Sequence, residues 1–423
     1  MSRGRRQPWP RPRSWRGLAV LALGLGVSAQ APAAGASPWT AAARFTQSES
    51  TNIFASLTQS QSDVTSQLQL DLGRQWSGEN WSFSANYAPE YTAYARFGQL
   101  DYFAQSYQQA WQYALGPHTS LIWSASAERY PERGTAPGLT GLTAVASASQ
   151  PLALGAVTSG GDTNLVWAHQ SSLRSSWTAN GTYSLQAFSP DTGLANAPGS
   201  TVALTPSSQS RSLGSGVGWM YTLSPSRSLN LSAQESEIWL SGQGQRRLYV
   251  NLQASLVQRL GSNFSVQAGV GPAEYWTLGA LAAGIPRATT SYAANVRLTG
   301  QFGHSVYGLS WSHTQQTSLV PGSITTDLLA LQYSNRWGAN WSVSGSFGGS
   351  LGSSLTAVTP TPGGNSSYFA SGQLAYRLGA DWALAASASL NSQSMPVLTG
   401  AGTLPLRRAQ YGLEMSYQFG GSQ

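Results

Sequence analysis

The chain has 423 residues, only 9% of them charged, and it contains no cysteine. A soluble domain carries about 25% charged residues, and a disordered chain lacks aromatic residues, whereas this sequence has 16 Trp, 18 Tyr and 11 Phe. Composition therefore excludes an ordinary soluble domain and a disordered chain, and the lack of cysteine excludes disulfides and thiolate metal sites.

Residues 1–36 have the order of a secretory signal peptide. Arginines come first, an apolar run covers residues 17–29, and small residues follow up to Ala36. The run is too short to cross a ~30 Å hydrocarbon core as a helix. We expect cleavage near Ala33 or Ala36, with an uncleaved anchor helix as the alternative. The net charge of +7 is largely that of the leader arginines, so the mature chain offers no basic patch for nucleic acid.

After the leader, the pattern is that of β-strands. Apolar and polar residues alternate in runs such as 248–256, 291–299, 341–347, 382–391 and 408–419, as in strands that face lipid on one side and a lumen on the other. No apolar run is long enough for a spanning helix, and in lipid a sheet must close so that every backbone group is paired. Glu235 and Glu237 interrupt the alternation near Trp239.

Tight turns near residues 77, 117, 172, 225, 262, 302, 338 and 380 divide the chain into hairpins. Their Gly, Pro, Asn, Asp and Ser residues supply the backbone angles that a sharp reversal needs. Longer Gly/Pro/Thr-rich segments alternate with these turns, as the external loops of such barrels alternate with periplasmic turns. The sequence predicts an all-β, transmembrane, antiparallel up-and-down barrel of about 18 strands, with 16 as the alternative, in a single domain over residues 37–423. No amino-terminal segment is large enough for a plug.

The last strand is the most specific local feature. One of its sides carries apolar residues that resemble the signal by which barrel-assembly machinery accepts its clients: Tyr411, Leu413, Met415, Tyr417 and Phe419. The alternative is simply a well-formed final strand. Aromatic residues that bracket the turns, such as Trp81, Trp177 and Trp337, favour a membrane barrel over a secreted β-helix. We therefore expect outer-membrane lipid and the assembly machinery as partners, and the bacterial outer membrane as the location.

Residue parity predicts which side chains face the lumen. The candidates are Arg247, Gln253, Arg259, Arg297, Arg336, Ser344, Gln373, Arg377, Arg408 and Glu414. Several arginines, with Arg74, lie near tight turns, where a positive ring would draw anions. The alternative is a set of rim arginines satisfied by acids or carbonyl groups. The other inward residues are mainly Ser, Thr, Gln, Asn and Tyr, which hydrogen-bond hydroxylated solutes without trapping ions.

Catalysis, metal binding and cofactor binding find no support in the sequence. Only His313 lies well inside a strand, and parity puts it on the lipid-facing side. A phospholipase-type triad would want a serine two residues away, where Trp311 and Gln315 stand. No His, Asp and Glu cluster has ligand spacing. The glycines at 214, 216 and 218 lie in a strand with no helix after them, so they predict no nucleotide loop. We expect a protein that is not an enzyme, with no cofactor.

Motifs in the amino-terminal third are Glu49 followed by residues 51–54 (TNIF), then Ser62-Asp63, residues 87–91 (YAPEY) and the turn at 116–121 (GPHTSL). With these motifs the chain resembles outer-membrane barrels associated with exopolysaccharide systems, including those found alongside PEP-CTERM protein sorting. The resemblance implies a role in passing or organising polysaccharide at the outer membrane.

The leading hypothesis is a passive conduit with a polar, nearly neutral lumen for saccharide or exported exopolysaccharide. The alternatives are a general diffusion porin, a non-conducting structural or adhesive barrel and, last, an enzyme that uses His313.

Overall fold

The computed structural model describes residues 39–51, 61–132, 156–190, 208–241, 245–279, 287–317, 323–354, 365–396 and 403–419. The leader and its cleavage site lie outside these ranges. No helix among the described residues is long and apolar enough to cross a membrane.

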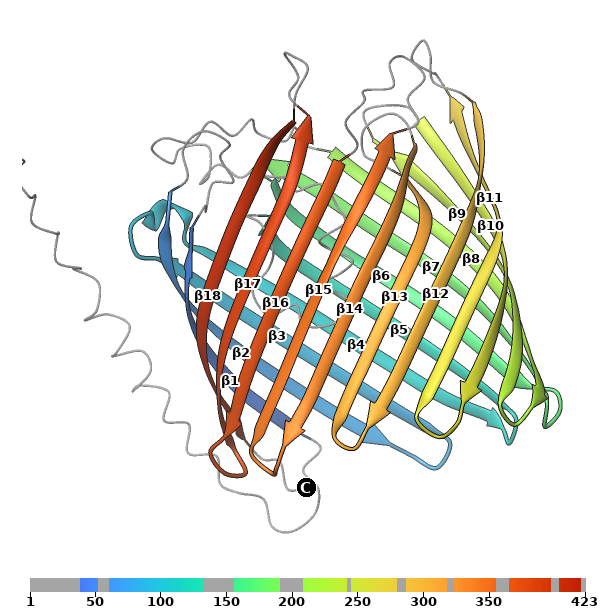
Figure 1. Ribbon diagram of the computed structural model, residues 1–423, viewed down its shortest axis with the longest axis horizontal. Coiled ribbons are helices and arrows are strands. Elements are labelled where there is room, and N and C mark those ends of the chain that lie inside the picture. The colour runs from blue at the N-terminus through green and yellow to red at the C-terminus, as the bar shows by residue number, and fades with distance from the viewer. Residues whose placement is uncertain are drawn as a thin grey trace, which may run out of the picture.

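The described residues form one antiparallel sheet that closes on itself (Figure 1). Its strands are β1 (Trp39–Ser50), β2 (Asp63–Ser77), β3 (Trp81–Tyr94), β4 (Tyr102–Gly116), β5 (Thr119–Glu132), β6 (Ala156–Gln170), β7 (Ser175–Pro190), β8 (Ser208–Ser224), β9 (Arg227–Leu240), β10 (Gln245–Leu260), β11 (Phe264–Gly279), β12 (Ala288–Phe302), β13 (Ser305–Thr317), β14 (Ser323–Trp337), β15 (Trp341–Ser354), β16 (Asn365–Arg377), β17 (Trp382–Pro396) and β18 (Thr403–Phe419). Each strand pairs with the next along the chain, and β1 pairs with β18. The predicted up-and-down barrel of 18 strands is confirmed.

The tight turns lie at one end of the barrel, which is the lower end in Figure 1. They fall at the predicted positions, because each alternating run ends in residues that tolerate a sharp reversal. Gly261 and Gly338 have φ values of 72° and 67°, a region that residues with a Cβ rarely adopt. At the opposite end, the 3-10 helix η1 (Gly98–Leu100) connects β3 to β4.

The ladder registers divide the side chains into two faces. One face carries large, solvent-accessible apolar side chains such as Leu252, Phe347 and Leu413, which is 68% exposed. The register places these residues opposite other apolar residues, as where Leu413 faces Ala386 across β17 and β18. Because such exposure in water would be costly, this outer face is suited to contact with lipid.

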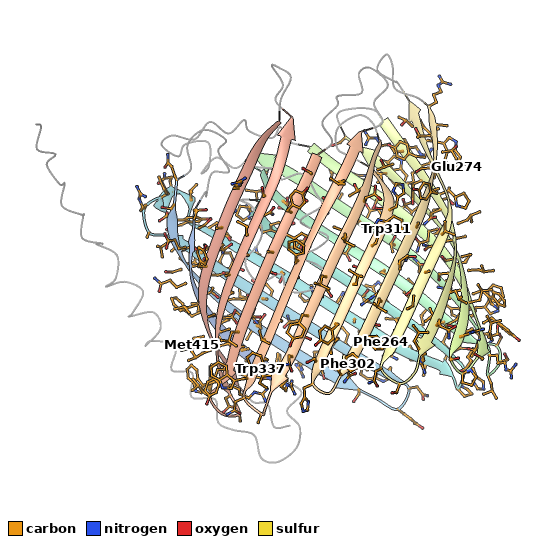
Figure 2. The ribbon with its side chains drawn as sticks, viewed as in Figure 1. Phe264, Glu274, Phe302, Trp311, Trp337 and Met415 are labelled. Atoms are coloured by element: carbon orange, nitrogen blue, oxygen red, sulfur yellow. The ribbon has the colours of Figure 1, made fainter. Side chains whose placement is uncertain are left out.

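Aromatic pairs gather near the tight turns on the outer face. The ring centroids of Trp341 and Tyr376 are 4.5 Å apart, and those of Trp382 and Tyr417 are 4.6 Å apart. Figure 2 labels Phe264, Phe302 and Trp337 at the same end of the barrel. A girdle of aromatic side chains marks the interface between hydrocarbon and water in outer-membrane barrels. The architecture is thus that of a barrel in a bacterial outer membrane.

Candidate functional site: the wall of the lumen

The second face of the sheet lines a cavity of about 680 Å³ beside β1 to β6. A single curved sheet encloses a cavity on its concave side, so this face is the inner face of the barrel. Residues of the same face line the cavity: Thr40, Gln75, Ser84, Asn86, Gln108, Ser124, Ser126 and Asp162. They supply mostly hydroxyl and amide groups, which donate and accept hydrogen bonds without a net charge.

Hydrogen bonds within and between strands hold polar groups of the inner face in place. The Ser126 hydroxyl of β5 donates to Asp162 of β6, and within β2 the Gln69 amide donates to Asp71 at 2.9 Å. On the opposite wall of the lumen, the Gln253 amide of β10 donates to Asn295 of β12 at 3.2 Å. Because each partner is held by the sheet, these groups present a fixed array to a solute rather than a mobile one.

Glycines on β8 make room for polar side chains on β7. A Cβ added at Gly214 or Gly218 would meet the hydroxyl of Thr182 or Thr178 on the inner face. The glycines belong to a strand that pairs on both sides, as the sequence predicted.

All the sequence-predicted lumen residues lie on the inner face. Ser344 stands opposite Gln373, and Arg297 stands opposite Gln267 on one side and Ser310 on the other. The remaining members of the set share that face by register: Arg247, Gln253, Arg259, Arg336, Arg377, Arg408 and Glu414. Arg247 is 1% exposed, so it is inaccessible to a solute.

Arg74 points the other way. Its guanidinium lies 4.3 Å from the Trp39 ring centroid and 4.0 Å from that of Trp76, on the outer face. A guanidinium that packs over aromatic rings near the tight turns is suited to anchor the barrel at the membrane interface. Within the described strands, the inward arginines near the tight turns therefore form an arc on β10 to β16 rather than a complete ring.

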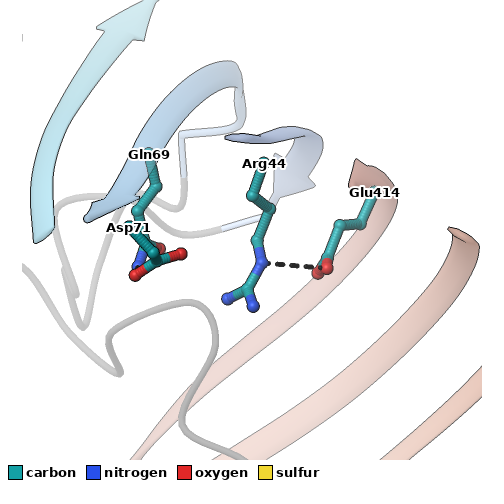
Figure 3. A network of polar contacts seen from close by, with 4 residues as sticks. All are labelled: Arg44, Gln69, Asp71 and Glu414. Carbon is teal, nitrogen blue, oxygen red and sulfur yellow. Dashed lines mark hydrogen bonds and ion pairs between the residues drawn. The ribbon is translucent and has the colours of Figure 1, made fainter. Parts of the chain in front are cut away.

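The seam between the first and last strands carries paired charges. Arg44 of β1 and Glu414 of β18 form an ion pair at 3.1 Å, and Gln69 and Asp71 lie beside them (Figure 3). Nearer the end of the barrel opposite the tight turns, Arg408 donates from Nε to the Ser50 hydroxyl at 2.8 Å. These contacts add side-chain bonds to the ladder that closes the barrel.

His313 lies on the outer face with Trp311, in a contact that the sequence did not reveal. Its Nδ1 is 2.9 Å from Oδ1 of Asp327, and its ring stacks on Tyr292 with the centroids 4.3 Å apart. The same-face positions opposite His313 hold Ala294 and Asp327, neither of which is a nucleophilic hydroxyl. The pair therefore lacks a neighbouring serine at these positions.

Glu235 and Glu237, which interrupt the apolar pattern, also point outward. Their register partners are the apolar Val250 and Leu248, and Glu237 forms an ion pair with Arg246. The strand is regular through this region, so the interruption changes the chemistry of the outer face and leaves the pairing intact. Cross-strand charge pairing, which parity alone does not show, accounts for Glu237.

No protein-family model matches the sequence, and no curated protein matches it. Among solved structures, the chain is similar to the FrpB iron transporter of Neisseria meningitidis, with 9% identity, a TM-score of 0.46, and coverage of 90% of this chain and 81% of that one. It is also similar to OccK2 (OpdF) of Pseudomonas aeruginosa, with 12% identity, a TM-score of 0.46, and coverage of 90% and 97%.

Proposed function

We propose that this protein is a passive channel of the bacterial outer membrane for saccharides, including exported polysaccharide. The observation that carries the proposal is the cavity wall of β1 to β6, where amide and hydroxyl groups converge. A hydroxylated solute loses hydrogen bonds with water when it enters the lumen, and such a wall replaces them. A closed barrel of 16–18 strands is about wide enough for an aqueous channel.

A second candidate is a barrel that does not conduct. Several inner-face residues at mid-height or above are almost fully buried: Thr158, Arg247, Ala273, Tyr275 and Ala330. In a wide, open pore, residues on the inner face would be exposed to water. Burial at this height favours a lumen that narrows there, as in a structural or adhesive barrel.

Single-channel recording of the refolded mature protein in planar bilayers tests both candidates. We expect stable conductance steps that neutral oligosaccharides block in a concentration-dependent manner. Block by small sugars as well as by oligomers would favour a general diffusion porin. Inserted protein that gives no steps would rule out the channel and support the non-conducting barrel.

The cavity wall can be tested by one substitution and its control. Asn86→Leu removes an amide from the cavity and leaves the sheet register unchanged, so sugars should block severalfold less tightly. Tyr87→Leu changes the adjacent residue on the outer face and should leave block unchanged. Equal effects of the two substitutions would contradict a binding role for the wall.

A further inference from the structure

Charges on the inner face are sorted by wall. Among the described side chains, the inner face of β2 to β9 carries carboxylates and no arginine: Asp63, Asp71, Glu90, Glu128 and Asp162. The inner face of β10 to β17 carries arginines and no carboxylate: Arg247, Arg259, Arg297, Arg336 and Arg377. We name these sets the acidic wall and the basic wall. The seam of β18 and β1 separates them with its own ion pair, Arg44–Glu414.

The two walls face each other across the lumen. In the closed strand order, β2 and β6 lie half a circuit away from β11 and β15. Figure 1 shows β3 to β5 passing behind β13 to β16. A barrel of 18 strands spaced ~4.8 Å apart and tilted by about 40° is about 36 Å across between opposite backbones.

The charges nearest to an aqueous path are accessible to a solute. Arg259, Arg297, Arg336 and Arg377 are exposed on one side, and Glu128 and Asp162 are exposed on the other. Arg297 lies five residues from the end of β12 at a tight turn, and Asp71 lies six residues from the corresponding end of β2. These two therefore stand at similar heights.

The rest of the mature sequence adds little charge. Beyond the leader, the residues outside the described ranges include only two charged ones, Arg133 and Asp191. The charge balance of the lumen is therefore set largely by the walls themselves.

Opposed charges with a small net sum create a field across the lumen, which the low-dielectric walls concentrate. A simple anion is attracted to the basic wall and repelled by the acidic wall, and a simple cation experiences the reverse. A solute that carries both an ammonium and a carboxylate group is attracted to both walls when it is oriented along the field, with its ammonium group towards the acidic wall. We infer that the lumen favours zwitterionic solutes over anions and cations of similar size. This inference rests on the proposed function, because it requires a conducting lumen.

Efflux from proteoliposomes containing the wild-type protein gives the first test. The vesicles hold 4-aminobutanoate, a zwitterion, together with erythritol, an uncharged solute of similar size. We expect the efflux ratio of 4-aminobutanoate to erythritol to fall about threefold between 10 mM and 1 M KCl, because the Debye length falls from about 30 Å to about 3 Å. A ratio that does not change with salt would overturn the inference.

Variants of each wall give the second test. Neutralising the basic wall (R259Q, R297Q, R336Q and R377Q) should raise the K⁺/Cl⁻ permeability ratio at least about threefold, and neutralising the acidic wall (D71N, E128Q and D162N) should lower it by a similar factor. The combined variant should return to the wild-type ratio yet lose its preference for 4-aminobutanoate. R74Q, on the outer face, serves as the control and should change neither quantity.

The outcomes separate this inference from the proposed function. Wild-type protein that inserts without conductance would overturn the channel and the inference with it. A conducting channel whose permeability ratio is unchanged in either single-wall variant would overturn the inference alone. Heat-modifiable electrophoretic mobility reports whether each variant has folded. If a wall variant does not fold, the wild-type salt series decides the question.

Discussion

At the scale of single residues, the outer face combines apolar anchors with a few polar pairs. His313 is held between Asp327 and Tyr292, at a height where the strand nears its external end. Alternation placed His313 on the correct face. It could not supply Asp327 as a partner, because that residue belongs to another strand and the sequence contains no measure of the register between strands.

We predict that His313→Ala lowers the free energy of unfolding by about 1 kcal/mol, because it removes a hydrogen bond and a ring stack. Urea titration of the barrel in lipid vesicles measures the change. Ser312→Ala, on the inner face of the same strand, is the matched control and should have a smaller effect. Neither substitution should alter conductance, and a loss of lipid-hydrolysing activity in the His313 variant would reinstate the enzyme hypothesis.

At the scale of elements, close backbone approach favours glycine at position 271. A Cβ at Gly271 of β11 would run into the backbone carbonyl of Leu252 on β10, beside Pro272, which has no N–H to give the ladder. Gly181 of β7 has open space around the same position. The two glycines look alike in the sequence, since both interrupt alternating runs. Only the pairing of strands distinguishes them.

Gly271→Ala should therefore destabilise the barrel by about 1–3 kcal/mol, whereas Gly181→Ala should be nearly neutral. Denaturant unfolding of both variants under one condition provides the comparison. Equal stabilities would show that the backbone of β10 shifts to accommodate the added methyl group without a loss of stability.

The last strand, β18, contributes to the aromatic girdle and also carries the predicted assembly signal. Phe419 packs edge-on against Tyr417 with the centroids 4.3 Å apart, and Tyr417 lies against Trp382. If the residues from Tyr411 to Phe419 act as the assembly signal, Phe419→Ser should reduce the amount of barrel in the outer membrane severalfold. Phe302→Ser removes an aromatic residue from the same girdle without touching the last strand. A similar loss for both variants would mean that Phe419 acts as a girdle residue only.

At the scale of the whole molecule, sequence periodicity predicted the strand number, the turn positions and the two faces. It did so because a strand has a period of two residues, and because tight turns need particular residue types. Periodicity did not predict the separation of acidic and basic walls. Asp71 and Arg297 are more than 200 residues apart in the chain, and only the closed order of strands brings them to opposite sides of one space.

Because the chain contains no cysteine, introduced cysteines can report on the two faces. Gln253→Cys, Ser344→Cys and Gln373→Cys should react with a water-soluble thiol reagent in intact vesicles. Cysteine at the outer-face positions should be protected by lipid: Leu252, Val296, Val343, Leu374 and Leu413. Labelling of both sets would contradict the register.

Pairing of β1 with β18 also sets the order of events during biogenesis. Thr51 and Ala409, which bond across this seam, are separated by 358 positions in the chain. Until the final strand is available, β1 has an open edge, which is a template for pairing with other chains. The barrel therefore cannot close before β18 is available, even if the other strands pair earlier. Closure is a late event, and covering the edge of β1 until then would protect the precursor from pairing with other chains.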